Sequence, residues 1–224
     1  MTESHYLPAM SPPTADANKP TVLIFGPLSR SLTQSNLSTL RTAILSSPQH
    51  AWVEHAIESL SGQYQMLVTG CPGLHDTVSK TQIDSLAAWL KTDDLVLDIE
   101  QLPNLVLAPL IVIEHLVQYK AFFASQTTIQ DGASVVETVG FCMGLLSAFT
   151  VALSHQSTAA DFEQNAGAAV RLAMLAGAAV DKQLLQDTRG PSKTLSVAWK
   201  RADSTNKSKD LQVILTRFPD VSIS

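Results

Sequence analysis

The sequence predicts an α/β fold with a parallel sheet, and three observations support this prediction. A short apolar run at residues 21–25 stops at Gly26-Pro27, as a strand buried on both faces of a parallel sheet does. A β-branched stretch at residues 134–139 runs through a turn into an apolar, helix-compatible segment. Helical periodicity fills the interval between them, so strands and helices alternate along the chain.

The predicted helices follow in order after the first strand. Three segments carry apolar residues at helical spacing, at Leu37, Leu40, Ile44 and Leu45, at Trp52, Ala56 and Leu60, and at Ile83, Leu86, Ala87 and Leu90. The next helix should run from a cap at Asn104 to about Phe123, with a kink or a later start caused by Pro109. An alanine-rich segment at residues 159–185 has high helix propensity and predicts a long helix.

The ends of the chain differ from this middle part. Residues 1–20 are polar and proline-containing, without the apolar run of a signal peptide, and predict a disordered leader. Beyond Gly190-Pro191, residues 194–199 alternate like a half-buried strand, residues 203–209 are a polar loop, residues 211–218 predict a short helix, and residues 221–224 begin another strand. We therefore expect a leader at 1–20, a core at 21–190 and a second part at 191–224.

The composition argues against several classes of function. Of the 224 residues, 45% are hydrophobic and 16% are charged, and the net charge of -5 argues against a nucleic-acid partner. Two cysteines, Cys71 and Cys142, are too few for a disulfide framework and lack zinc-site spacing, so we expect no metal and a reducing, cytoplasmic compartment. The apolar stretches at 105–117 and 139–153 fall short of the roughly 20 residues that a bilayer requires, so we expect no membrane.

The turn after the second predicted strand carries the chemistry. Gly140, Cys142 and Gly144 form a G-x-C-x-G pattern, which is the nucleophile elbow with cysteine in place of serine. The glycines let the strand and the following helix approach each other closely. The helix N-terminus favours the thiolate of Cys142, and the backbone N–H of Met143 is placed to bind the oxyanion of an acyl-transfer intermediate. The pattern predicts nucleophilic sulfur chemistry at Cys142.

An inert buried cysteine is the alternative interpretation of Cys142, and the strand–turn–helix context weighs against it. Cys71 has no helix after it and is interpreted as structural. A cysteine nucleophile normally works with a histidine base, and none of the six histidines is convincing. His155 would lie about 20 Å from Cys142 along one helix, whereas His75 in a loop is the least implausible. The others are His5 in the leader and His50, His55 and His115 in helical stretches.

The elbow is part of a longer pattern. Its segments are residues 23–26, 102–110, 115–119, 139–148, 196–199 and 218–220. In order and spacing they resemble the starter-unit acyl-carrier-protein transacylase domains of fungal non-reducing polyketide synthases, which have a malonyl-transacylase-like fold. The cysteine in the elbow is the specific part, because extender-type relatives carry serine there.

The resemblance implies both a fold and a reaction. The fold is a parallel-sheet α/β-hydrolase-like acyltransferase core at residues 21–190, followed by the start of a ferredoxin-like small subdomain at residues 191–224. In the reaction, an acyl-CoA or a partner fatty acid or polyketide synthase acylates Cys142. The acyl group then passes to the phosphopantetheine arm of an acyl carrier protein, and no bound cofactor is implied.

The resemblance also points to two further site residues. The other oxyanion N–H of the family comes from the turn after the first strand, where glutamine is common and this chain has Leu28. Extender-type relatives hold the malonyl carboxylate with an arginine on the long helix after the elbow, and the matching position here is Ala176. An apolar pocket at Ala176 suits an uncharged starter and rejects malonyl, whose carboxylate would lack a partner.

The end of the chain departs from the family pattern. In the family the catalytic histidine follows the small subdomain, whereas this chain ends at Ser224, so we expect an N-terminal portion with impaired turnover. A thioester hydrolase with the same elbow and a non-catalytic remnant that binds a carrier protein are the alternatives. Lys and Arg residues concentrate at residues 182–217, which predicts either a surface that steers an acidic carrier or an ordinary solvated face.

Overall fold

The computed structural model describes residues 21–26, 32–70, 80–92, 97–99, 102–125, 136–154 and 157–186. The chain divides into two compact units, residues 1–182 and residues 183–224, and the description concerns the first unit. The predicted leader, the loop around Cys71, the small subdomain from residue 191 and most of the basic segment lie outside the described residues.

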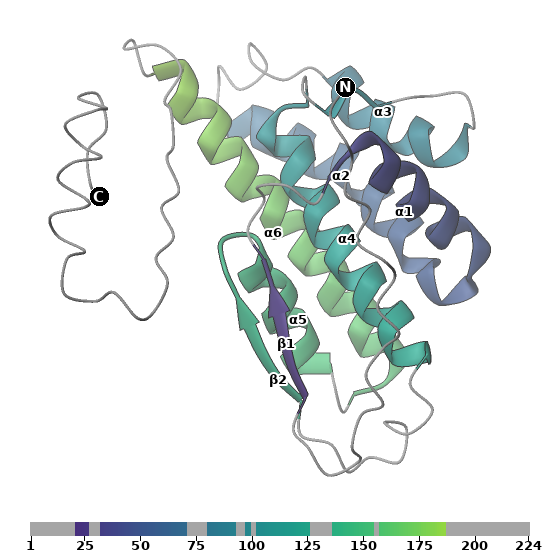
Figure 1. Cartoon of the computed structure of the whole chain (residues 1–224). Coiled ribbons are helices and arrows are strands. Elements are labelled where there is room, and N and C mark those ends of the chain that lie inside the picture. Colours follow the sequence, from purple (N-terminus) through teal and green to yellow (C-terminus); the bar gives the residue numbers. More distant parts are fainter. Residues whose placement is uncertain are drawn as a thin grey trace, which may run out of the picture. The chain divides into compact units, whose positions relative to one another are not determined.

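Two strands and seven helical segments make up the described part (Figure 1). They are β1 (Thr21–Phe25), α1 (Gln34–Ser46), the short 3-10 helix η1 (Pro48–His50), α2 (Trp52–Gly70), α3 (Lys80–Lys91), α4 (Asn104–Ser125), β2 (Val136–Gly140), α5 (Gly144–Ser154) and α6 (Ala159–Gln186). Each strand and helix predicted within these residues is present, so the α/β class is confirmed, with helices in the majority.

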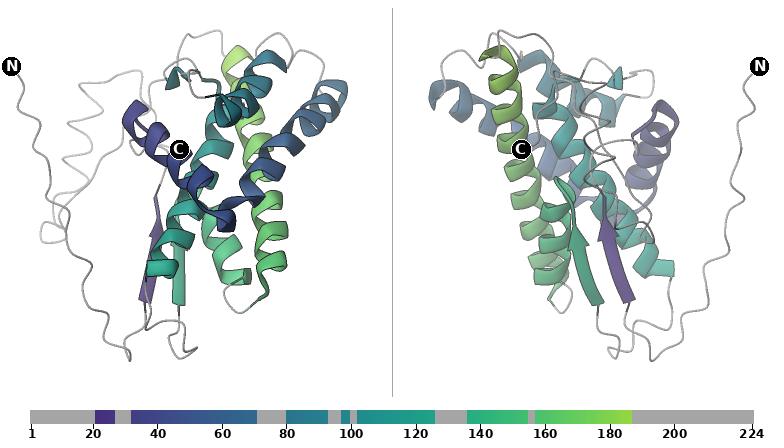
Figure 2. Two further views of the ribbon diagram at one scale, coloured as in Figure 1. Left: turned by 90° about the vertical axis from the view of Figure 1, so that its right-hand side faces the viewer. Right: turned by 60° about the vertical axis from the view of Figure 1, so that its left-hand side comes forward.

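The strands β1 and β2 pair in parallel, with Thr21 opposite Val136 and Phe25 opposite Gly140. The strands lie beside α5, as two further views show (Figure 2), and the Thr138 hydroxyl of β2 donates to the Ala148 carbonyl of α5 at 3.1 Å. The prediction that the first strand is buried on both faces is wrong. Phe25 is buried, but Val22 is 49% exposed and Ile24 is 68% exposed.

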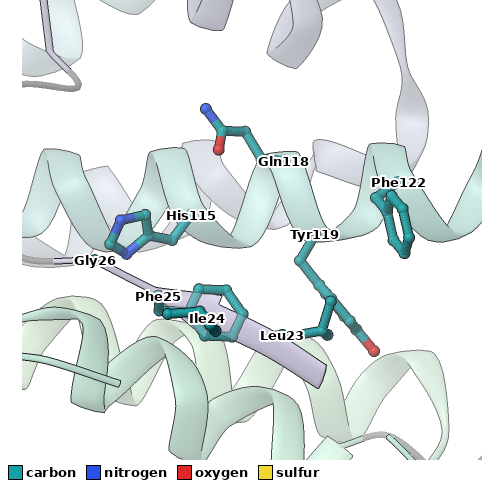
Figure 3. A pocket seen from close by; sticks show the side chains of 8 residues that line it. All are labelled: Leu23, Ile24, Phe25, Gly26, His115, Gln118, Tyr119 and Phe122. Carbon is teal, nitrogen blue, oxygen red and sulfur yellow. The ribbon is translucent and has the colours of Figure 1, made fainter. Parts of the chain in front are cut away.

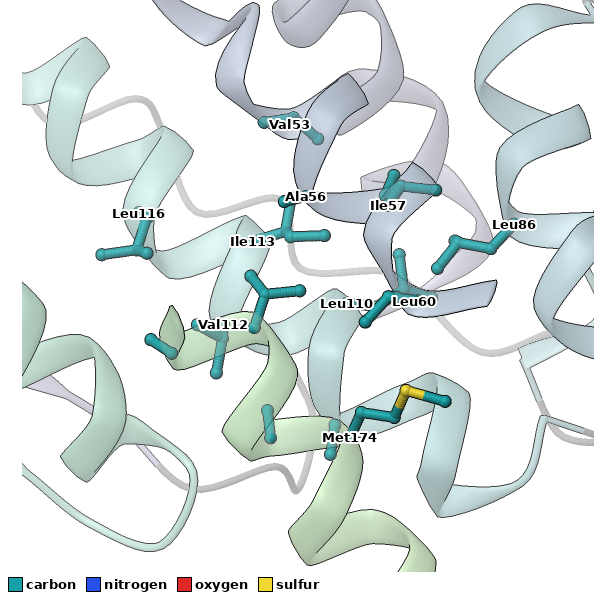
Figure 4. Packing of buried hydrophobic residues seen from close by; sticks show 14 of the residues in the cluster. Val53, Ala56, Ile57, Leu60, Leu86, Leu110, Val112, Ile113, Leu116 and Met174 are labelled. Carbon is teal, nitrogen blue, oxygen red and sulfur yellow. The ribbon is translucent and has the colours of Figure 1, made fainter. Parts of the chain in front are cut away.

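The core lies among α2, α3, α4 and α6 (Figure 4). Leu60 of α2, Leu86 of α3, Leu110 of α4 and Met174 of α6 are fully buried. Burial of one such side chain contributes roughly 1.5–3 kcal/mol to folding. Every residue of α4 from Ala108 to Val117 is buried, which shows that this helix lies at the centre of the core.

Helix α4 begins at Asn104 as predicted and not later, and it continues through Pro109. Pro109 is the sixth residue of α4, so its nitrogen cannot donate the hydrogen bond to the Leu105 carbonyl that another residue would make. By length and composition alone, Asn104–Ala124 within this helix is long and apolar enough to cross a bilayer. Its most apolar window is 61% buried within the protein, which is typical of a core helix.

The N-terminus of α4 is held by α6. Asp181 of α6 is buried and accepts hydrogen bonds from the Asn104 backbone N–H at 3.0 Å, the Asn104 side-chain amide at 2.8 Å and the Leu105 N–H at 2.8 Å. A carboxylate at a helix N-terminus satisfies free N–H groups and interacts favourably with the helix dipole. Asp181 therefore fixes the beginning of α4 against α6.

Candidate active site at the turn between β2 and α5

The predicted strand–turn–helix unit is present. Strand β2 ends at Gly140, and α5 begins at Gly144. The turn between them is closed by a hydrogen bond from the Gly144 N–H to the Phe141 carbonyl at 2.9 Å and by one from the Leu145 N–H to the Cys142 carbonyl at 3.0 Å. The Phe141 N–H donates to the Phe25 carbonyl at 3.0 Å, which anchors the turn to β1.

Cys142 stands at the tip of this turn in an unusual backbone conformation. Its φ of 55° lies in the left-handed region, and among the described residues no other non-glycine residue has a positive φ. For a side chain other than glycine this conformation costs roughly 1–2 kcal/mol, and such strain concentrates at functional sites. The Cys142 thiol is free and exposed, so a reactant can approach the sulfur.

Glycine is required on both sides of the cysteine because the backbones nearly touch. A Cβ at Gly140 would overlap the Gly144 carbonyl and lie 2.5 Å from the Leu145 Cα. A Cβ at Gly144 would overlap the Phe25 carbonyl and lie 2.7 Å from the Gly26 oxygen. Real Cβ contacts are never this short, so any larger side chain would push α5 away from the strands. The G-x-C-x-G spacing is thus a packing requirement of the turn.

The expected oxyanion donors are only partly within the described structure. Met143 precedes α5 directly, and its N–H donates to no backbone carbonyl among the described residues. Helix N-termini attract anions, so an oxyanion would be stabilised at this place. Leu28 lies outside the described residues. The oxyanion roles of Met143 and Leu28 remain predictions.

A buried hydrogen bond joins α4 to the first turn of α5. The Nδ1 atom of His115 lies 3.1 Å from the Ser147 hydroxyl, and both residues are buried. Burial lowers the pKa of His115 below its ordinary value, so the neutral imidazole is favoured. Its ring also packs against Phe25 at a centroid distance of 5.7 Å. Sequence reasoning missed this pair, and the one available signal was a histidine and a serine within two apolar helices.

The other histidines do not approach the turn through any described interaction. His50 is buried in η1, and burial together with the charge of Lys120 lowers its pKa. His55 is exposed on α2. The remaining three, His5, His75 and His155, lie outside the described residues. The described part of the chain therefore does not identify a general base.

A pocket of about 310 Å³ lies between β1 and α4 (Figure 3). One side is lined by three residues of β1 and the residue that follows the strand: Leu23, Ile24, Phe25 and Gly26. The other side is lined by four residues of α4: His115, Gln118, Tyr119 and Phe122. Gly26 and His115 lie at one end of this row, whereas Tyr119 and Phe122 lie towards the other. The pocket thus follows β1 from its C-terminal end.

The remaining predicted site features can be placed but not assigned a role. Ala176 is half-buried on α6, beside Gly177, which packs against the Asn104 carbonyl, and Ala176 does not line the pocket along β1. Its role in an acyl pocket remains a prediction. Among the described residues, no group of three or more His, Cys, Asp or Glu side chains is arranged to hold a metal ion.

Comparison with known proteins gives one consistent result. Residues 23–222 match the family model described as "Starter unit:ACP transacylase in aflatoxin biosynthesis". The non-reducing polyketide synthase pks11 of Talaromyces marneffei is 34% identical over 91% of this chain, and dbaI of Emericella nidulans is 34% identical over 90%. The non-reducing polyketide synthase pigA of Monascus ruber is 32% identical over 91%. In each case the match covers 8% of the length of the synthase.

Proposed function

Because the chain belongs to the starter unit:ACP transacylase family, we propose that it transfers an acyl starter through a thioester on Cys142 to an acyl carrier protein in polyketide biosynthesis. The observation that carries this proposal is the exposed Cys142 held at a φ of 55° between two glycines, directly before a helix. The alignment with non-reducing polyketide synthases supports the same assignment.

The first half-reaction loads the cysteine. The thiolate of Cys142 attacks the carbonyl carbon of an acyl-CoA, and the N–H groups of Met143 and Leu28 stabilise the oxyanion that forms. The bond between the carbonyl carbon and the coenzyme A sulfur then breaks. Coenzyme A leaves as a thiolate and takes up the proton that Cys142 lost, so one thioester is exchanged for another. The resemblance implies that a histidine serves as the general base that shuttles this proton.

The second half-reaction unloads it. The thiol of a carrier-protein phosphopantetheine attacks the acyl-Cys142 thioester, the same N–H groups bind the new oxyanion, and Cys142 recovers its thiol. A partner fatty acid or polyketide synthase is an alternative acyl donor. Acyl-CoA and the phosphopantetheine thioester are substrates, so the proposal needs no resident cofactor. We place the reaction in the cytoplasm, in keeping with a nucleophile that must stay reduced.

The finer architecture is also part of the proposal. The parallel pair β1 and β2, with the elbow between β2 and α5, supports a parallel-sheet α/β-hydrolase-like core. A ferredoxin-like small subdomain would begin near residue 191. Ala176 on α6 would present an apolar surface where extender-type relatives hold a carboxylate, which favours an uncharged starter.

Intact-mass measurement tests the proposal. We expect a panel of acyl-CoAs to give an adduct of one acyl group that is absent in Cys142→Ala and retained in Cys71→Ala, the matched cysteine control. Transfer of the label to a phosphopantetheinylated carrier protein then completes the reaction. Release of free acid without carrier protein would identify a thioester hydrolase. The absence of any adduct with every donor would contradict both catalytic functions and leave carrier binding alone.

A further inference from the structure

His115 of α4 contacts both elements that hold the Cys142 turn. Its Nδ1 atom lies 3.1 Å from the Ser147 hydroxyl of α5. Its ring packs against the Phe25 ring at the end of β1, at a centroid distance of 5.7 Å (Figure 3). The Phe25 carbonyl in turn accepts the hydrogen bond from the Phe141 N–H that anchors the turn. One side chain of the central helix therefore joins the strand that anchors the elbow to the helix that follows it.

Ser147 lies in the first turn of α5, the part of the helix that completes the elbow. It is the fourth residue of α5 and follows Met143 by four positions, which is about one turn of an α-helix. Ser147 is fully buried, so its hydroxyl is shielded from bulk water. A shift of this turn relative to β1 would move the Met143 N–H, one of the two oxyanion donors in the proposed reaction.

The chemical character of this contact separates it from the apolar packing around it. His115 lies within the stretch of α4 from Ala108 to Val117, in which every residue is buried. A buried polar side chain costs free energy unless it is hydrogen-bonded, so an aliphatic side chain would serve simple core packing better. Apolar contacts are non-directional, whereas a hydrogen bond fixes the distance and direction between two atoms. The histidine thus fits a role in holding α5 at a defined place.

We propose that His115 is a positioning residue: through its hydrogen bond with Ser147 it holds the first turn of α5, and with it the Met143 N–H, in place against the Cys142 turn. The inference rests on the proposed function. Loss of one oxyanion donor lowers turnover by roughly 100–1,000-fold, and a displaced donor should cost part of this. We expect loss of the hydrogen bond to slow acylation of Cys142 by about tenfold or more.

Two reactions of the same thiol separate positioning from general damage. Acylation by an acyl-CoA passes through an oxyanion. Alkylation by iodoacetamide forms a bond from sulfur to carbon as iodide leaves and the thiol proton passes to the buffer, so no oxyanion needs to be stabilised. Both rate constants are measured by intact mass in a Cys71→Ala background, in which Cys142 is the only cysteine. His115→Leu should slow acylation by about tenfold or more and change alkylation by less than about twofold.

Three further variants assign the effect to the hydrogen bond. Ser147→Ala should slow acylation as much as His115→Leu does. His115→Asn should restore most of the rate, because its amide places a polar atom close to the position of the imidazole Nδ1. Thr150→Val is the matched control, because Thr150 is a buried residue of α5 whose hydroxyl donates to the Leu146 carbonyl of the same helix at 2.9 Å. Thermal unfolding establishes that each variant is folded, and Ser147→Ala decides the question if His115→Leu is not.

Three results would overturn the inference. The first is an equal acylation rate in His115→Leu and in the parent protein. The second is an equal loss of acylation in Ser147→Ala and in Thr150→Val. The third is a parallel fall of acylation and alkylation in His115→Leu, because this would indicate general disturbance of the turn instead of displacement of an oxyanion donor.

Amide hydrogen exchange keeps the outcome independent of the proposed function. The N–H groups of residues 144–146 each donate to the carbonyl three positions earlier, at 2.9 to 3.1 Å, and report on the turn without any reaction. If the protein accepts no acyl group from any donor, the proposed function fails. Exchange of these N–H groups that is faster by about fivefold or more in His115→Leu and Ser147→Ala, but not in Thr150→Val, would still support the placement of α5. Unchanged exchange in both variants would overturn the inference whether or not Cys142 is acylated.

Discussion

Replacement of Asp181 by alanine should lower the free energy of unfolding more than replacement of an exposed carboxylate by alanine does. Asp181 is buried on α6 and accepts three hydrogen bonds from the first two residues of α4, at 3.0, 2.8 and 2.8 Å. Helix α4 is the central helix of the core, so its N-terminal anchor affects the packing of α2, α3 and α6 around it. The Asp181→Ala variant removes all three acceptor contacts at once.

The size of the effect follows from these contacts. The Leu105 N–H is buried and would lose its acceptor, which costs roughly 1–3 kcal/mol. Asn104 is half-buried and can bind water instead, so its two lost bonds cost about 0.5 kcal/mol each. We expect a decrease in the free energy of unfolding of about 3 kcal/mol, or roughly 6–12 °C in Tm for a chain of this size. Asp181→Asn keeps one acceptor oxygen and should lose about half as much.

Urea unfolding followed by circular dichroism measures this effect. The matched control is Asp161→Ala, because Asp161 is an exposed carboxylate that accepts hydrogen bonds from the Thr158 N–H at 3.0 Å and the Thr158 hydroxyl at 2.7 Å at the start of α6. Loss of that exposed cap should cost about 1 kcal/mol. If Asp181→Ala is no less stable than Asp161→Ala, the argument that α6 anchors α4 is wrong.

Three further predictions concern the turn and the buried histidines. Gly140→Ala should abolish acylation and lower Tm, because the added methyl group would overlap α5. Gly62→Ala is the control, because Gly62 faces open space within α2, and it should stabilise the protein by about 0.5–1 kcal/mol. Equal Tm values for the two variants would refute the packing requirement at Gly140. Cys142→Gly should raise Tm and Cys142→Val should lower it, because only glycine adopts a φ of 55° without strain. A higher Tm for the valine variant than for the glycine variant would contradict backbone strain at Cys142. Burial lowers the pKa of His50 and of His115, so the unfolded chain binds more protons below about pH 6.5 and stability should fall as the pH decreases from there. Urea midpoints at pH 7.5 and 5.5 measure that loss, which His115→Gln should reduce.

The part of the fold that was predictable from sequence depends on local patterns. The apolar run that became β1, the alanine-rich α6 and the glycine pair around Cys142 each leave a signal within a few residues. The beginning of α4 was predicted from Asn104, although its cap is mainly Asp181, 77 positions away in the sequence. Local propensity identifies a helix end but not the distant side chain that satisfies it.

The features that escaped prediction depend on tertiary contacts. The bond between His115 and Ser147 joins two helices through residues 32 positions apart, and no periodicity encodes such a pair. The pocket along β1 likewise exists only because α4 lies beside the strand. The exposure of Ile24 was mispredicted for the same reason, since an apolar run does not reveal which of its faces the helices cover.

The parallel pairing of β1 with β2 also determines when the two-stranded sheet can form during synthesis. Thr21 pairs with Val136, so the ribosome adds 115 residues after Thr21 before it reaches the pairing partner. At roughly 5–20 residues per second, β1 waits about 6–23 s on the ribosome while α1 to α4 are made and begin to pack. The elbow requires both strands, so Cys142 acquires its geometry only after α1 to α4 have been made.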